Sequence, residues 1–165
     1  ELRPVIGTVH VDKRDNMRPG WKYGDWERKG VPLRLEIGPR DLADEKVMMA
    51  ARHDRSKNAV PFTDLATAVP AELERIQQEL YQRALDRRTE ATCNIDTWDD
   101  FLALFRGDGG FAHAHWCGDG ACEKTIQDKT KVTIRNIPFE RDETPAQCVH
   151  CGNDSIGRVL FSQSY

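Results

Sequence analysis

Short apolar patterns separated by polar loops fill the first part of the chain. Valines and isoleucine within residues 5–11 predict a strand, and the spacing of large aromatic residues within 21–29 predicts a short helix that ends at Gly30. Apolar and polar residues alternate through 31–37 and again through 47–52, which is the period of half-buried strands. Residues 53–58 are charged and predict a turn.

A long helical pattern follows. Leu73, Ile76 and Leu80 recur at three- to four-residue spacing, with Pro70 at an early position, and the pattern continues to about residue 88. A second helix is expected from Thr97, whose side chain can cap it, to Gly107.

The last part of the chain predicts a small α+β module. Strands are expected at 111–116, 132–139 and 158–161, and a helical turn at 122–129. These three strands are short, so the module has little apolar area with which to stabilise itself.

Together these elements predict two domains. The first has an α/β layout with a mixed sheet, and its visible strands are so few that a first strand and helix are expected to be missing. The expected limits are 1–69 for the first domain, 70–92 for a connecting helix and 93–165 for the C-terminal domain.

Two cysteine pairs dominate the C-terminal domain. Cys117 and Cys122 form a C-x4-C pair, and Cys148 and Cys151 form a C-x2-C pair. Two close pairs can supply four thiolates in a tetrahedron, which predicts a closed, structural zinc site without an open position for water. The zinc would then stabilise the fold without activating a nucleophile.

Other arrangements of these side chains stay open. The thiols can form disulfides or remain ordinary buried groups, although a fifth cysteine, Cys93, and the lack of a signal-peptide pattern favour zinc. Three histidines are near enough in sequence to replace a thiolate ligand: His113, His115 and His150.

Composition excludes some classes of partner. The net charge is −3 and charged residues make up 31% of the chain, so it lacks a global basic field, and any nucleic-acid contact must come from a local patch. No apolar run approaches the roughly 20 residues that cross a bilayer. We therefore expect a cytoplasmic protein that binds neither membrane nor DNA.

No catalytic motif appears. The chain contains neither G-x-S-x-G nor a phosphate-binding G-x-x-x-x-G-K-S/T, and the glycines of 107–110 follow a helix and predict a turn. His10 alternates with valines and is interpreted as a residue on the polar face of a strand.

Aromatic and charged residues are interleaved in 21–29, close to Arg34. Rings such as that of Trp26 can stack on unpaired RNA bases, while Lys22, Glu27 and Arg34 can bind base edges and phosphates. The simpler interpretation is an amphipathic helix with two core tryptophans and a solvated charged face.

The stretch 19–41 closely resembles the anticodon-binding domain of prolyl-tRNA synthetases of the archaeal and eukaryotic type, and the resemblance extends through the cysteine pairs to the end of the chain. It implies a truncated anticodon-binding domain followed by a zinc-containing C-terminal domain. Glu27, Arg34 and Lys57 match positions that resemble the family's anticodon readers, whereas His53 and Asp54 stand where the family more often has a second arginine. Proline anticodons share two adjacent guanines. The edges of guanine can bind one acidic side chain, such as Glu27, and two basic ones, such as Arg34 and Lys57.

The resemblance also implies what lies outside the chain. The parent enzyme would be a homodimeric proline–tRNA ligase that uses ATP and Mg²⁺, and the catalytic domain is not in these residues. The carboxylate of Tyr165 is expected to approach that catalytic domain. The alternative is an independent, zinc-stabilised module that binds RNA or protein.

Overall fold

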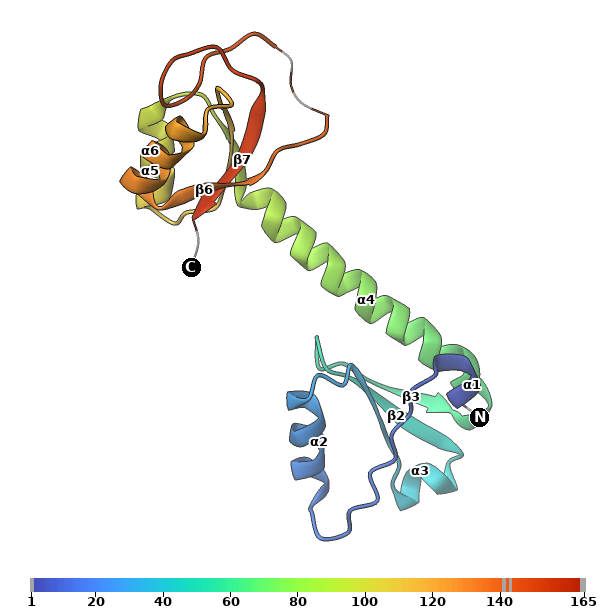
Figure 1. Ribbon diagram of the computed structural model, residues 1–165. Coiled ribbons are helices and arrows are strands. Elements are labelled where there is room, and N and C mark those ends of the chain that lie inside the picture. Colours follow the sequence, from blue (N-terminus) through green and yellow to red (C-terminus); the bar gives the residue numbers. More distant parts are fainter. Residues whose placement is uncertain (1, 141, 143, 164–165) are drawn as a thin grey trace. The chain divides into compact units, whose positions relative to one another are not determined.

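The computed structural model describes residues 2–140, 142 and 144–163. The chain divides into two compact units between Ala84 and Leu85, within one long helix, α4 (Leu65–Glu90), as Figure 1 shows. Each unit has a core of its own.

The first unit is built on a three-stranded sheet. Its strands are β1 (Leu33–Glu36), β2 (Lys46–Ala51) and β3 (Lys57–Pro61), in the order β1-β2-β3. Both pairs are antiparallel, so the mixed sheet expected here is not found among the described strands. The remaining elements are α1 (Arg3–Ile6), α2 (Pro19–Arg28), α3 (Pro39–Ala43), a 3-10 turn η1 (Phe62–Asp64) and the first part of α4.

Alternate side chains of β2 point into the core of this unit. Val47 and Met49 are buried together with Val60 of β3 and Val69 of α4. The predicted helix at 21–29 and the strands at 31–37 and 47–52 are confirmed as α2, β1 and β2.

Two local predictions in the first unit are wrong. Residues 5–11 form no strand: α1 ends at Ile6, and residues 8–14 have no regular structure, because Val5 and Val11 are 48% and 62% exposed and find no sheet to join. The turn expected at 53–58 is shorter, since β3 already begins at Lys57. After β1, Pro39 begins the short helix α3, which was not predicted, and Asp41 caps its N-terminus: the Asp41 carboxylate accepts the Gly38 N–H at 2.9 Å.

Helix α4 confirms the long helical pattern but begins five residues before Pro70. Its first turn continues from η1, and Leu65 and Ala68 pack on the core of the first unit. Tertiary packing thus extends the helix ahead of the proline.

The second unit contains a four-stranded sheet. Its elements are β4 (Thr92–Ile95), α5 (Trp98–Arg106), β5 (Phe111–His115), α6 (Gly120–Thr130), β6 (Val132–Asn136) and β7 (Arg158–Gln163). The strand order is β4-β5-β7-β6, with β4 and β5 parallel and the other pairs antiparallel. The expected three strands are therefore four: β4 was missed because its four residues contain too little alternation to be recognised.

Helices α5 and α6 both contribute side chains to the core that packs on this sheet. Phe101 of α5 and Phe161 of β7 are fully buried, with ring centroids 5.2 Å apart, and Ile126 of α6 joins the same core. The Thr97 cap is confirmed, because its hydroxyl accepts the Asp100 N–H at 3.1 Å.

Candidate functional site

Four charged side chains in the first unit form a continuous chain of ion pairs. Arg34 of β1 donates from Nη1 to Glu27 Oε1 of α2 at 2.5 Å and from Nε to Glu36 Oε1 at 2.9 Å. Lys57, at the start of β3, donates to Glu36 Oε2 at 3.0 Å. The β1–β2–β3 register and the packing of α2 thus bring together the three residues that the family resemblance singled out.

Exposure separates these four groups into two kinds. The side chains of Glu27 and Lys57 are 47% and 50% exposed, whereas Arg34 and Glu36 are only 19% and 15% exposed. Arg34 lies on the half-buried strand β1, and its neighbours cover most of its side chain. The two outer groups, one acid and one base, are the ones that a ligand can reach.

The inner pair is held in its charged form. Burial works against the charge of Arg34, but hydrogen bonds to Glu27 and Glu36 outweigh it and raise its pKa. Burial likewise acts to raise the pKa of Glu36, but the hydrogen bonds from Lys57 and Arg34 lower it overall. Because Arg34 and Glu36 stay ionised, they hold the side chains of Glu27 and Lys57 in fixed positions.

Tyr23 is a member of this site that sequence reasoning missed. The Arg34 guanidinium carbon lies 4.1 Å from the centroid of the Tyr23 ring. Tyr23 precedes Glu27 by four residues, so both lie on the same face of α2. That spacing was the available signal. The ring fixes the plane of the guanidinium.

Trp26 is engaged within the protein. Its indole N–H donates to Asp12 Oδ2 at 2.8 Å, Lys29 Nζ lies 4.5 Å from the ring centroid, and the His10 ring lies 4.2 Å away. Hydrogen bonds from Arg14 and Trp26 hold the pKa of Asp12 well below its usual range. Trp26 therefore fastens the irregular segment before α2, which is why His10 is no part of a strand.

Lys22 and Trp21 make none of the contacts described for Trp26. Lys22 is half-buried and makes no ion pair within the described part of the chain. Trp21 is 78% exposed, so the expectation of two core tryptophans is wrong for it.

His53 and Asp54, the residues that depart from the family pattern, face α4. His53 Nε2 lies 2.7 Å from Glu79 Oε2, and Arg75 donates to Asp54 at 3.0 Å and to Glu79 at 2.6 Å. His53, Asp54 and Glu79 have the ligand types of a metal site. The Arg75 guanidinium, however, already neutralises both carboxylates, so the group works as a tie between the β2–β3 turn and α4.

In the second unit, the four predicted cysteines meet. Cys117 follows β5, Cys122 lies in the first turn of α6, and Cys148 and Cys151 lie in the turn before β7. Their sulfur atoms all lie within 4.8 Å of one another, and those of Cys122 and Cys148 are 3.8 Å apart. Sulfurs about 2.3 Å from a tetrahedral zinc are about 3.8 Å from each other, so the cluster could hold such an ion.

Backbone geometry supports the cluster. The Val149 N–H donates to the His115 carbonyl at 2.9 Å, and the Ile156 N–H donates to the Trp116 carbonyl at 2.8 Å. Gly118 adopts φ +84°, and a Cβ there would lie 3.1 Å from Ile156, so glycine is required for this turn between Cys117 and α6.

The thiols differ in their surroundings. Burial, followed by the neighbouring Cys148, raises the pKa of Cys122, and burial raises that of Cys117. Burial opposes ionisation of Cys148 too, but hydrogen bonds from the backbone of Cys151, His150 and Cys117 lower its pKa. Those N–H groups are already directed at a sulfur that would become a thiolate.

The histidines are not among the four clustered ligands. His150 Nδ1 lies 3.4 Å from Cys122 Sγ, while its Nε2 lies 3.1 Å from the Lys129 ammonium and so acts as an acceptor. Burial and Lys129 lower the pKa of His150, so a neutral ring can donate its Nδ1–H to the sulfur. His115 is buried and bonded to Ser155 at 3.1 Å, and His113 lies on β5. Cys93 Sγ lies 3.8 Å from the Phe111 carbonyl, away from the cluster.

Comparison with known proteins finds one matching family model for each unit. Residues 5–72 match the family described as "Anticodon binding domain", and residues 98–165 match "Prolyl-tRNA synthetase, C-terminal". The chain corresponds to the C-terminal part of a prolyl-tRNA synthetase, with its anticodon-binding domain.

Individual relatives agree over the whole chain. The proline–tRNA ligase of Christiangramia forsetii is 42% identical over 165 residues, and proline–tRNA ligase 2 of Clostridioides difficile is 36% identical over 165 residues; the match covers 100% of this chain and 34% of each relative. The prolyl-tRNA synthetase of Cryptosporidium parvum, crystallised with L-proline and AMP, superimposes with a TM-score of 0.89 at 32% identity, over 99% of this chain and 35% of that one. The chain thus spans about a third of the length of these synthetases.

The two sites fall within the two matched regions of the synthetase. The Glu27–Lys57 ion-pair chain lies in the anticodon-binding region, and the four cysteines lie in the C-terminal region. None of the described helices is long and apolar enough to cross a membrane. Tyr165, the predicted contact with a catalytic domain, lies outside the described residues.

Proposed function

We propose that the first unit binds the anticodon of proline tRNA and that Glu27 reads guanine. The observation that carries this proposal is the chain of ion pairs from Glu27 through Arg34 and Glu36 to Lys57, within the anticodon-binding region. The exposed carboxylate of Glu27 can accept the N1–H and N2–H groups of a guanine. Lys57 can donate to guanine O6 or N7, or to a phosphate.

Arg34 has a different part in this proposal. It already contacts two carboxylates and the Tyr23 ring, so it fixes the Glu27 carboxylate in one orientation and keeps one oxygen free. A carboxylate that is oriented before binding loses less conformational entropy when the base arrives. Trp26 supports this surface by holding the segment before α2, and both Trp26 and Lys22 belong to the proposed RNA-binding surface.

The charge change at Glu27 tests the proposal. In the full-length protein, Glu27→Gln should weaken the binding of proline tRNA about ten- to 100-fold, the range for loss of a charge-assisted hydrogen bond. Glu74→Gln is the matched control, because Glu74 loses the same charge on α4 while it keeps an acceptor for Gln78. Equal affinity of the two variants would reject the reading role of Glu27.

We further propose that the cysteine cluster holds a structural zinc ion. Three features support this choice. Four thiolates would fill a tetrahedral shell and leave no position for water, the sulfurs of Cys122 and Cys148 are 3.8 Å apart, and backbone N–H groups point at Cys148. Zinc would join β5, α6 and the turn before β7, and it would take no part in chemistry on a substrate.

The parent protein is proposed to be a proline–tRNA ligase of the archaeal and eukaryotic type. It would work as a cytoplasmic homodimer that activates proline with ATP and Mg²⁺ in a catalytic domain outside this chain, with Tyr165 contacting that domain. The domain limits of 1–69, 70–92 and 93–165 belong to the same proposal. An independent interaction module is not favoured, because the relatives named above are all proline–tRNA ligases or prolyl-tRNA synthetases.

A further inference from the structure

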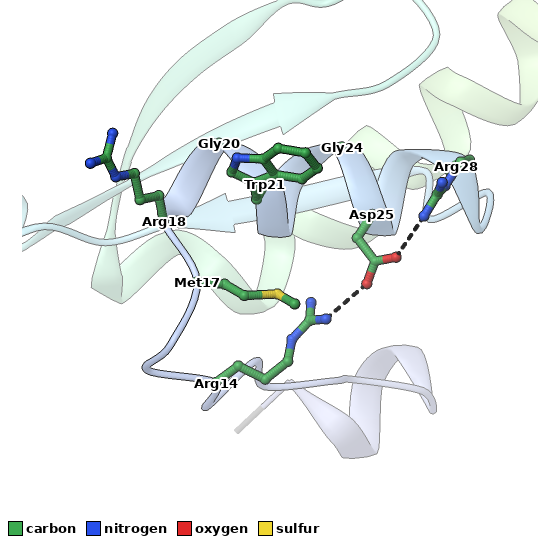
Figure 2. A pocket seen from close by; sticks show the side chains of 8 residues that line it. All are labelled: Arg14, Met17, Arg18, Gly20, Trp21, Gly24, Asp25 and Arg28. Carbon is green, nitrogen blue, oxygen red and sulfur yellow. Dashed lines mark hydrogen bonds and ion pairs between the residues drawn. The ribbon is translucent and has the colours of Figure 1, made fainter.

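A second aromatic and cationic surface lies on the other face of α2. Residues on a helix are about 100° apart, so Trp21 and Tyr23 point in directions about 200° apart. Trp21, Asp25 and Arg28 share one face. With Arg14, Met17 and Arg18 they line a hollow of about 710 Å³ (Figure 2).

Trp21 has no packing role in the described structure. Helix α2 has no buried residue, the Trp21 ring is 78% exposed, and it stacks on no other described ring or cation. Figure 2 shows the indole lying along the helix beside Gly20 and Gly24. A Cβ at either glycine would meet nothing within 4 Å, so packing does not explain these helix-weakening residues. Their effect is to leave the space beside the ring open.

Arginines surround the ring. Arg14 and Arg28 each pair with Asp25, at 3.0 and 3.2 Å, and Arg28 is 82% exposed. The Arg18 guanidinium extends away from the other side chains (Figure 2) and pairs with no acid in the described part of the chain. Three arginines and one aspartate line this hollow. Asp12 also pairs with Arg14 from outside the lining, at 2.6 Å, so the three arginines still exceed the two acids and leave the rim with a net positive charge, although the whole chain carries −3. A positive rim around an exposed flat ring suits an unpaired nucleotide, with its base on the ring and its phosphates on the arginines.

We propose that Trp21 stacks on an unpaired RNA base whose phosphates contact Arg18 and Arg28. This inference rests on the proposed function: the base belongs to a nucleotide of the tRNA loop next to those that Glu27 reads. A helix is about 10 Å across, so one strand that bends around α2 can reach both faces. Stacking contacts no base edge, so the site accepts any base.

Substitutions at Trp21 test the stacking. In the full-length protein, Trp21→Ala should weaken binding of proline tRNA about five- to 150-fold, the range for loss of one stacked base, whereas Trp21→Phe should retain most of the affinity. Arg18→Gln should lower the slope of log affinity against log salt by about one. Melting temperatures should stay unchanged, since none of these side chains is buried.

The outcomes separate this inference from the proposed function. If Trp21→Ala binds tRNA like the wild type while Glu27→Gln weakens binding, the stacking site is rejected and anticodon reading stands. If Trp21→Ala weakens binding of both proline tRNA and an unstructured RNA while Glu27→Gln has no effect, the stacking site stands and the reading role fails. If neither variant changes affinity, both are rejected.

Discussion

At the scale of single residues, exposure assigns different parts to groups of like chemistry. Glu27 and Glu36 are both carboxylates bonded to Arg34, yet Glu27 is 47% exposed and Glu36 is 15% exposed. A base can reach the first, while the second only holds Arg34 and Lys57 in place. The family resemblance identified Glu27, Arg34 and Lys57, but the alternating pattern could not show that Glu36 would join them.

Glu36 should make stability depend on acidity. Burial opposes its charge, but Lys57 and Arg34 lower its pKa below the ordinary value of 4.5. A lowered pKa stabilises the folded state above pH 4.5, and this contribution is lost as the pH falls below that value toward the folded pKa. The wild type should therefore lose more unfolding free energy between about pH 5 and pH 3 than Glu36→Gln does, as measured by urea unfolding. Parallel pH profiles would contradict this assignment.

At the scale of elements, contacts distant in sequence decide what local patterns leave open. Residues 5–11 contain the valines and isoleucine typical of a strand, but no neighbouring strand is available to them, and Asp12 and Arg14 tie the following segment to α2 instead. Strand β3 carries polar Lys57 and Asn58 and is recognisable only through its pairing with β2. Long periodic elements such as α4 and capped ones such as α5 could be predicted because their signals are local.

Arg75 should hold the β2–β3 turn against α4. It donates to Asp54, Glu72 and Glu79, at 3.0, 2.6 and 2.6 Å. Arg75→Gln should speed hydrogen exchange of the amides of residues 52–57, because the turn loses its charged tie. Arg83→Gln, on the same helix but without an ion pair in the described structure, is the matched control. Equal exchange in both variants would show that the tie has no effect.

The cysteine cluster should bind one zinc ion per chain. Cys148→Ser should reduce zinc content from about one ion per chain to well below that value and lower the melting temperature, because a closed site needs all four ligands. Cys93→Ser is the control, since Cys93 lies outside the cluster. Zinc content that is unchanged in Cys148→Ser, or absent from the wild type, would reject the site.

At the scale of the whole molecule, the proposed recognition surface and the proposed zinc site lie in different units. The ion-pair chain around Arg34 belongs to the first unit, and the four cysteines belong to the second. The cysteine spacing predicted its cluster directly, because four thiols in two close pairs leave few alternatives. The recognition surface could be predicted only in part: Tyr23 and Trp21 differ by two residues in sequence but face opposite sides of α2, which the pattern of aromatic residues does not reveal.

A double-mutant cycle that removes one group of the RNA and one side chain of the protein tests the central claim most directly. Inosine lacks the N2 amino group of guanine, so replacing each anticodon guanine of proline tRNA in turn by inosine removes one donor to Glu27. For the wild-type full-length protein, inosine at one of the two positions should lower the affinity about tenfold. For Glu27→Gln, the same inosine should lower the affinity no further. The difference corresponds to a coupling energy of about 1–2 kcal/mol between the guanine N2 group and Glu27. An inosine penalty of equal size in both proteins at both positions would contradict the reading of guanine by Glu27.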